Sequence, residues 1–439
     1  MTLPRIYRTI ISPAPGRVWV LYHWERDSVQ SHPASIPWVR SSNLGGHRQA
    51  LNGVPGHASE GLVSKPRVLE VRHLPELFAA LQKRGYRLIG PAVREGAIVY
   101  EELRTPAELP VGWGDEQEAG RYRLIRRDDD AVFGYAVGPH SWKRFLHPSV
   151  MTLWRARQTA DGLAIETSVE EPPLLALFGV RSCDLHAIAV KDRVLLGGPF
   201  ADPYYRARRA RIFIVAVNCG HFTPSTCFCV SMRTGPRVAD GFDLALTEVL
   251  QPGNHLFVVE VGSESGEEVL RDVPHRPAEP SEVEAAERVV ATTAAHMGRS
   301  LETAGLKEAL YAAMESPYWD VVAERCLTCG NCTMVCPTCF CFTVEDRTDL
   351  TGTVTERIRR LDVCFTTEFT YTAGRPLRLS ARSRYRQWLT HKLGTWFDQF
   401  GVSGCVGCGR CITWCPVGID ITREATAIRR ASEQGSATR

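Results

Sequence analysis

The sequence contains 439 residues, of which 44% are hydrophobic and 23% are charged, a balance typical of globular proteins. The formal net charge is only +3, so the composition gives no support for a nucleic-acid-binding protein. No stretch approaches the roughly 18 apolar residues of a membrane-spanning helix, and no secretory signal is recognisable. We therefore expect a cytoplasmic protein of two or three domains that binds neither nucleic acid nor membrane.

The first 68 residues differ from the rest of the chain. They are rich in Pro, Gly and Ser and show no sustained hydrophobic periodicity. Such a segment cannot bury enough apolar surface to offset its ordering entropy. We therefore predict that residues 1–68 form a disordered extension.

Residues 70–275 carry the patterns of both helices and strands. A helix is predicted from Leu74, because Pro75 suits a first helical turn and the apolar residues that follow share one face. Continuous apolar runs at 174–180 and 211–217 are typical of strands covered on both faces, with a crossover helix at 184–196. Further strands are expected at residues 86–89, 97–100, 122–125 and 131–137. This region is predicted to be an α+β or α/β domain.

The C-terminal part, residues 281–430, is expected to contain helices and loops. Ser281 and Glu284 have the spacing of a capping box, which predicts a helix running towards Gly298. Helical patterns continue up to Cys326, and we expect helix and loop beyond it.

A doubled cysteine motif is the most informative feature of the sequence. The pattern Cys-x2-Cys-x2-Cys-x3-Cys-Pro begins at Cys326 and again at Cys405. This spacing is typical of [4Fe–4S] ligands, and in two-cluster proteins the fourth cysteine of each run binds the other cluster. The predicted ligand sets are Cys326, Cys329, Cys332 and Cys415 for one cluster, and Cys405, Cys408, Cys411 and Cys336 for the other.

Zinc is the alternative ligand for paired Cys-x2-Cys motifs. A zinc site needs four ligands, however, and does not require a third cysteine at fixed spacing followed by Cys-Pro, repeated in full. The long spacing between the two runs, with helical sequence on both sides, favours an α-helical ferredoxin domain with two [4Fe–4S] clusters.

Four further cysteines form a candidate third iron–sulfur site. Cys183 and Cys219 each follow a predicted buried strand, and Cys227 and Cys229 follow in the next loop. Because the carboxyl ends of parallel strands meet at one edge of a sheet, we expect the four thiols to lie near one another. They could hold a third [4Fe–4S] cluster, or they could be small buried hydrophobic side chains.

The remaining motifs do not complete a site. Cys339, Cys341 and Cys364 are expected to pack around the clusters. The basic stretch that begins at Arg382 could neutralise the clusters, dock an acidic partner or form a solvated face. No dinucleotide-binding, phosphate-binding, haem or hydrolase motif is recognisable, so no catalytic residue is predicted.

Several stretches together resemble a known family. They include FGVRSCDLHAIAVKDRVLL, NCGHFTPSTCFCVSM and RCLTCGNCTMVCPTCFCFTVED, and the resemblance covers residues 70 to 425. They resemble the beta subunits of cytosolic nickel–iron sulfhydrogenases and are similar to the iron–sulfur electron-transfer subunits of anaerobic sulfite reductases. The resemblance implies an iron–sulfur electron-transfer protein that relays electrons between other redox partners and a flavin-containing, NAD(P)-reacting subunit. In the hydrogenases these partners are a nickel–iron subunit together with a small iron–sulfur subunit.

Three alternatives stay open at this stage. The chain could serve an anaerobic sulfite reductase in place of a hydrogenase. It could be a redox sensor or scaffold in which the clusters are structural. It could also be a self-contained iron–sulfur reductase with an unrecognised flavin or substrate site.

Overall fold

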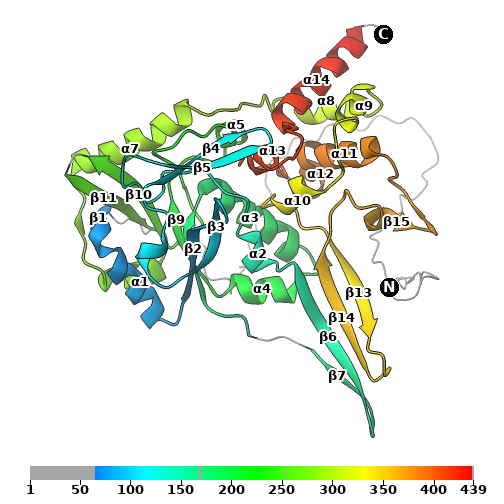
Figure 1. Cartoon of the computed structure of the whole chain (residues 1–439), viewed down its shortest axis with the longest axis horizontal. Coiled ribbons are helices and arrows are strands. Elements are labelled where there is room, and N and C mark those ends of the chain that lie inside the picture. The colour runs from blue at the N-terminus through cyan, green and yellow to red at the C-terminus, as the bar shows by residue number, and fades with distance from the viewer. Residues whose placement is uncertain (1–64, 168–170, 252, 438–439) are drawn as a thin grey trace, which may run out of the picture.

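The computed structural model describes residues 65–167, 171–251 and 253–437 (Figure 1). Most of the predicted extension, residues 1–64, lies outside this range. The expected limit at residue 68 is wrong by two residues, because strand β1 (Arg67–Glu70) pairs with β11 (Asn254–Val261). Val68 is only 1% exposed and belongs to the hydrophobic core.

An eight-stranded sheet forms the centre of the molecule, in the order β12-β1-β11-β10-β9-β8-β2-β3 (Figure 1). Its other strands are β2 (Arg87–Arg94), β3 (Ala97–Leu103), β8 (Leu175–Val180), β9 (Ile212–Val217), β10 (Leu244–Gln251) and β12 (Arg276–Pro277). The four strands β2, β8, β9 and β10 run parallel, and the outer pairings are antiparallel. The predicted strands β8 and β9 are buried, as their continuous apolar runs indicated.

Helices cover both faces of this sheet. On one face, α1 (Leu74–Lys83) and α6 (Glu264–Arg271) pack against side chains such as Phe213 and Phe257. The other face is covered by α2 (Lys143–Leu146), α3 (Ser182–Leu196), α4 (Pro203–Arg209) and α7 (Pro280–Ala295). The predicted crossover helix between the two buried strands is α3. The fold is therefore a mixed α/β fold, as expected.

The predicted strand at residues 131–137 is wrong, because this segment is irregular. The backbone N–H groups of Val132 and Phe133 donate to the buried Glu248 carboxylate at 2.6 and 2.9 Å. The Arg181 guanidinium donates to the carbonyls of Phe133 and Tyr135. Buried charged side chains therefore satisfy the backbone groups that a strand would pair with a neighbour.

Two of the hairpins outside the central sheet have six or more residues in each strand. The first pairs β4 (Trp113–Glu118) with β5 (Arg121–Arg126). The second joins β13 (Phe342–Thr348) to β14 (Val354–Leu361), in the interval between the two cysteine runs. Only helix and loop were expected in that interval, so that expectation is wrong.

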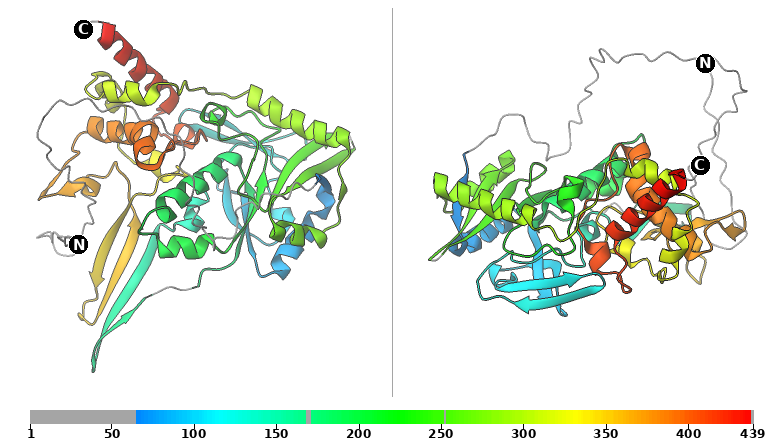
Figure 2. Two further views of the ribbon diagram at one scale, coloured as in Figure 1. Left: turned by 180° about the vertical axis from the view of Figure 1, so that it is seen from behind. Right: turned by 90° about the horizontal axis from the view of Figure 1, so that it is seen from above.

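A second, four-stranded sheet explains this difference. Strand β14 pairs with β6 (Val150–Thr159), which in turn pairs with β7 (Gly162–Glu166). Together with β13 they form an arm that projects from the rest of the molecule (Figure 1 and Figure 2). The sheet combines strands from both sides of the predicted domain boundary, and the division into 70–275 and 281–430 stays a prediction.

Helices surround the cysteine motifs in the remainder of the chain. They are α8 (Leu306–Ala312), α9 (Tyr318–Ala323), α10 (Asn331–Met334), α11 (Ala381–Thr390), α12 (Trp396–Phe400), α13 (Arg410–Thr413) and α14 (Ile421–Ala437). A π-helical turn, His391–Thr395, joins α11 to α12. Trp319, Trp388 and Ile428 belong to the apolar core of this part. No helix in the described part of the chain is long and apolar enough to cross a membrane.

The capping box at the start of α7 differs from the predicted one. Glu279 and Glu282 form it, and Pro280 occupies the first helical turn. The prediction from Ser281 and Glu284 was wrong by two residues. Proline suits the first turn because the N–H that it lacks would have no partner within the helix there.

Candidate iron–sulfur centres

The first candidate site contains cysteines from both runs of the doubled motif. Cys326, Cys329 and Cys332 line one cavity with Cys415, which comes from the second run. Gly330 adopts a left-handed conformation within this loop, with φ of 74°. A Cβ atom at this position would lie 2.7 Å from the side chain of Val363, so glycine allows the loop to approach its neighbour.

Apolar side chains form the rest of this first cavity. They are Leu327, Phe365, Tyr385, Trp388 and Ile419. One side is open, since Cys329 is exposed and Leu327 is 61% exposed. Burial raises the pKa of Cys332 well above its usual value, and the nearby Cys364, Cys326 and Cys415 thiols add to the increase. The predicted set of four thiols therefore lies together, with one edge at the surface.

The second candidate site lies deeper than the first, since Cys336, Cys405 and Cys408 are buried. Burial raises the pKa of Cys405 to about 12, and the neighbouring Cys408 and Cys336 thiols contribute to the increase. Burial also raises the pKa of Cys411 well above its usual value, with further contributions from Cys405, Cys408 and Cys336. Cys336, which belongs to the first run, therefore lies among the three thiols of the second run.

Cys336 differs from the other thiols because a buried lysine lies beside it. The Nζ atom of Lys392 lies 3.2 Å from the Cys336 Sγ and 3.6 Å from the Cys339 Sγ. A hydrogen bond from Cys339 and the nearby ammonium hold the pKa of Cys336 well below its usual range, although burial opposes them. Cys336 is therefore favoured as a thiolate, which is the form that binds metal.

The third candidate site lies at the carboxyl edge of the central sheet, as predicted. Cys183, in the first turn of α3 after β8, and Cys219, after β9, line one cavity with Cys227 and Cys229. Burial raises the pKa of Cys183 well above its usual value, and the adjacent Asp184 and Cys408 add to the increase. The four thiols therefore converge, although more than 40 residues separate the first from the last.

A buried cation also lies beside this third cavity. Arg181 lines it and is 1% exposed. Burial raises the pKa of Cys219, and the Arg181 guanidinium opposes this increase through its charge and a hydrogen bond. The same guanidinium lies over the rings of Phe133, Tyr135 and Phe222.

The second run packs directly against the loop of the third site. The Phe228 N–H donates to the Gly407 carbonyl at 2.8 Å, and the Thr234 hydroxyl donates to the Val406 carbonyl at 2.7 Å. A Cβ atom on Gly407 would lie 2.7 Å from the backbone of Cys229 and Phe228. Close approach of the two segments therefore requires a glycine at position 407.

The three candidate sites form a row with the second run in the middle. Cys411 lines the first cavity beside Cys415, whereas Cys408 lines the third cavity beside Cys183. Both residues come from the short segment 408–411, so this one segment borders both cavities.

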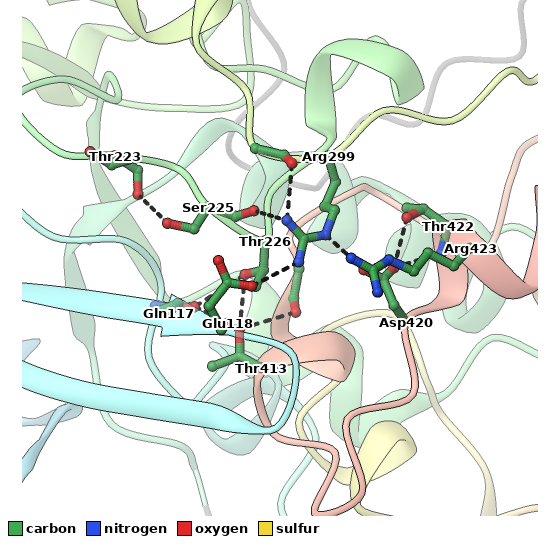
Figure 3. A network of polar contacts seen from close by, with 12 residues as sticks. Gln117, Glu118, Thr223, Ser225, Thr226, Arg299, Thr413, Asp420, Thr422 and Arg423 are labelled. Atoms are coloured by element: carbon green, nitrogen blue, oxygen red, sulfur yellow. Dashed lines mark hydrogen bonds and ion pairs between the residues drawn. The ribbon is translucent and has the colours of Figure 1, made fainter. Parts of the chain in front are cut away.

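A polar network holds this arrangement together (Figure 3). The Arg299 guanidinium donates to the Asp420 carboxylate at 2.7 Å, to the Glu118 carboxylate at 3.0 Å and to the Ser225 carbonyl at 2.9 Å. The hydroxyls of Thr226 and Thr413 lie 2.8 Å apart, and both donate to the Gln117 side-chain oxygen. The network connects the β4–β5 hairpin, the loop of the third site and the second run.

The remaining cysteines lie against the first two sites. Cys364 contributes to the electrostatic environment of Cys332, and Cys341 to that of Cys364. Cys339 lies beside Cys336, as described above. Their positions agree with the expectation that they pack around the clusters.

The basic stretch that begins at Arg382 is a helix that packs against the rest of the protein. It forms α11, in which Tyr385 and Trp388 are buried. Arg382 and Arg386 form ion pairs with Glu315, and Arg384 donates to backbone carbonyls that include that of Phe365. The alternative that this stretch is a free solvated face is therefore wrong.

Sequence reasoning missed the buried charges around the sites. Lys392, Arg181, Asp184 and Arg410 are all at most 2% exposed. Asp184 directly follows Cys183, and Arg410 stands between Cys408 and Cys411, so their positions next to cysteines were a usable signal. Lys392 offered no such signal, because it belongs to a basic stretch far from any cysteine in the sequence.

The donor sets fit iron–sulfur clusters, since they consist of thiols enclosed mainly by apolar side chains and backbone. Within the part of the chain that the structure describes, no three His, Cys, Asp or Glu side chains form a group that could hold a single metal ion.

Comparison with known proteins supports this interpretation. Residues 325–419 match the family described as a 4Fe-4S dicluster domain. Sulfhydrogenase 2 subunit beta of Pyrococcus furiosus is 37% identical over 368 residues, which cover 82% of this chain and 97% of that protein. No solved structure matches the chain. The expected resemblance is confirmed: the chain belongs to the family of sulfhydrogenase beta subunits and carries a 4Fe-4S dicluster domain in its C-terminal part.

Proposed function

We propose that this protein is the electron-transfer subunit of a multisubunit oxidoreductase, in which it carries electrons through three [4Fe–4S] clusters. The observation that carries the proposal is the row of three cysteine-lined sites, in which Cys411 and Cys408 connect the middle site to its two neighbours. Neighbouring sites that share one short segment are suited to a relay.

The proposed ligand sets follow the thiols that lie together. The first cluster takes Cys326, Cys329, Cys332 and Cys415; the second takes Cys336, Cys405, Cys408 and Cys411; the third takes Cys183, Cys219, Cys227 and Cys229. The first two belong to the dicluster match, and we propose that this part folds as an α-helical ferredoxin domain with an inserted β-hairpin.

Clusters of this kind, when bound, supply one-electron carriers, while the protein sets their potentials through burial and hydrogen bonds to sulfur. The side chains of Leu327, Phe365 and Trp388 limit the access of water to the first site. At the second site the Gly407 N–H lies 3.5 Å from the Cys405 Sγ, in position to donate to it. These contacts tune the carriers without providing a substrate site.

Both ends of the row reach the surface. At one end Cys329 is exposed. At the other end Phe222 lines both the third cavity and a neighbouring cleft of about 1100 Å³. At the middle site Cys336, Cys405 and Cys408 are buried, and Cys405 also lines a surface cleft of about 660 Å³. In this proposal electrons enter at one end of the row and leave at the other.

The partners in this proposal follow from the family. The relative is by name a subunit of a sulfhydrogenase, which implies assembly with other chains. We propose three partner subunits in the cytoplasm: one that contains flavin and reacts with NAD(P), a small one with iron–sulfur clusters, and one with nickel and iron. The chain itself would not choose the substrate, since no dinucleotide-binding motif is recognisable in its sequence.

Anaerobic purification of the native complex through a tag on this chain tests the proposal. The expected complex contains flavin and nickel in addition to iron. A complex that contains flavin but no nickel and that reduces sulfite would assign the chain to a sulfite reductase. Purified single chain that oxidises NAD(P)H by itself, with tightly bound flavin, would contradict the relay and support a self-contained reductase.

A further inference from the structure

We propose that the Lys392 ammonium is a built-in positive charge that raises the reduction potential of the cluster held by Cys336 and the second cysteine run. This inference rests on the proposed function, because it assumes a cluster at that site. It assigns a role to a residue in the basic stretch, for which the sequence suggested only general neutralisation.

The backbone directs Lys392 into the protein. It lies in the π-helical turn His391–Thr395, where an extra residue is accommodated within a helical turn. Such turns are frequent at functional sites. The Lys392 side chain points into the interior and the residue is only 2% exposed.

All close partners of Lys392 are neutral groups or thiols. Its Nζ atom donates to the Thr338 hydroxyl at 3.3 Å and to the Gly404 carbonyl at 3.1 Å. The other two contacts are the Cys336 and Cys339 sulfurs, at 3.2 and 3.6 Å. Among the residues that the structure describes, no carboxylate forms an ion pair with Lys392.

A buried cation without a carboxylate is costly unless another negative charge compensates it. The nearest candidate is the Cys336 thiolate together with the iron–sulfur core that it would bind. Reduction of a [4Fe–4S] core adds one negative charge. Attraction between charges is strong away from water, so the ammonium stabilises the reduced form more than the oxidised form.

Aromatic side chains keep water away from this charge. The rings of Trp388 and Trp396 lie 5.9 and 6.0 Å from the Lys392 Nζ atom. A Cβ atom on Gly404 would lie 2.2 Å from the Trp396 ring, so the glycine lets its carbonyl approach the ammonium beside that ring. Since little water can screen the charge, its effect on the cluster is retained.

Two other buried lysines lack the contact with a cysteine sulfur that Lys392 makes. Lys143 donates to the carbonyls of Thr333 and Met334, and Lys191 donates to the carbonyl of Cys339. Both donate to backbone oxygens, whereas Lys392 reaches the sulfur of a proposed ligand. Lys143 is therefore a matched control: it is a buried lysine in the same region without this contact.

Redox titration of anaerobically reconstituted full-length protein, monitored by electron paramagnetic resonance, tests the proposal. Lys392→Met and Lys392→Gln should each change the ratio of reduced to oxidised second cluster at least tenfold at a fixed potential. This corresponds to a midpoint lower by about 59 mV for a one-electron couple. Lys392→Arg should keep most of the wild-type midpoint, because the positive charge remains. Lys143→Met should shift it less.

Iron content separates the failure of this inference from the failure of the proposed function. A second cluster that is present in Lys392→Met with an unchanged midpoint would overturn the role of Lys392. A wild-type midpoint in Lys392→Gln would also overturn it, because a hydrogen bond would then suffice without charge. Loss of the cluster from all three Lys392 variants would show a role in assembly in place of tuning. Wild-type protein without a second cluster would instead contradict the proposed function.

Discussion

Asp184 and Arg410 form a fully buried, bidentate ion pair that connects two of the candidate cluster sites. Both hydrogen bonds are 2.9 Å long, and the two side chains are 1% and 0% exposed. Asp184 adjoins Cys183 of the third site, whereas Arg410 stands between Cys408 and Cys411 of the second. The Nε atom of Arg410 also donates to the backbone carbonyls of Gly138 and His140, which adds to the hydrogen bonds of the pair.

Replacement of Asp184 by Asn should strongly destabilise the protein. The change leaves the buried Arg410 charge without its partner, which costs about 3–5 kcal/mol in comparable pairs. The free energy of unfolding, measured anaerobically by denaturant titration, reports the loss. Glu433→Gln is the control, because it removes an exposed ion pair with Arg429 and should cost about 1 kcal/mol or less. Equal costs for the two variants would show that the buried pair is not important for stability.

The exchange of fourth ligands predicts which cluster each serine variant damages. Cys336→Ser should impair the cluster of the second run, although Cys336 belongs to the first run, because its thiol lies among Cys405, Cys408 and Cys411. Cys415→Ser should impair the other cluster for the corresponding reason. Electron paramagnetic resonance of the two reduced variants distinguishes the clusters. Damage confined in each variant to the cluster of its own run would contradict the exchange.

The third site predicts the iron content. Anaerobically reconstituted protein should hold about twelve irons, and the double variant Cys227→Ser, Cys229→Ser should hold about eight. Cys341→Ser is a matched control, because Cys341 is a largely buried thiol outside the three ligand sets, and it should leave the iron content unchanged. An unchanged iron content in the double variant would show that these cysteines are buried side chains and do not bind a cluster.

His147 predicts a dependence of stability on pH. Burial and the nearby Lys191 and Arg359 lower the pKa of His147 to about 2, from an ordinary value of 6.5. The folded protein therefore keeps the imidazole neutral, whereas the unfolded chain takes up a proton below pH 6.5. Stability from this group is present above pH 6.5 and is lost as the pH falls, by about 1.4 kcal/mol between pH 7.5 and 5.5.

A phenylalanine at position 147 should remove this pH dependence. Among the described residues neither ring nitrogen of His147 has a hydrogen-bond partner, and the ring packs against Phe342. When the pH is lowered from 7.5 to 5.5, the free energy of unfolding of His147→Phe should therefore fall by about 1.4 kcal/mol less than that of wild type. The exposed His296 provides the control, and His296→Phe should behave like wild type. Identical pH profiles for wild type and His147→Phe would refute the assignment.

Sequence patterns predicted the parts of the site that local spacing determines. Within each cysteine run, the spacing of the cysteines along the chain identifies them as ligands. The strands before Cys183 and Cys219 are continuous apolar runs, and they bring both thiols to one edge of the sheet. The same approach missed the ion pair of Asp184 and Arg410, because charged residues are assigned to the surface unless their partner is known. The two residues are 226 positions apart, and no sequence pattern indicates that they are in contact.

Long-range pairing explains the other differences. Strands β13 and β14 are rich in charged residues and lack a clear apolar alternation, and they are stabilised by β6 from a distant part of the chain. Residues 131–137 show the opposite case. Their apolar composition suggested a strand, yet Glu248 and Arg181 occupy their backbone groups. In both cases the deciding partner lies far away in sequence.

Anaerobic reductive titration of the isolated, reconstituted chain tests whether this protein is an electron relay. A low-potential donor should reduce the protein by about three electrons per chain, one for each cluster, and an added acceptor should take them back. NAD(P)H alone should not reduce it at a useful rate. Protein that takes up no electrons, or that oxidises NAD(P)H without any other subunit, would contradict the assignment as an electron relay.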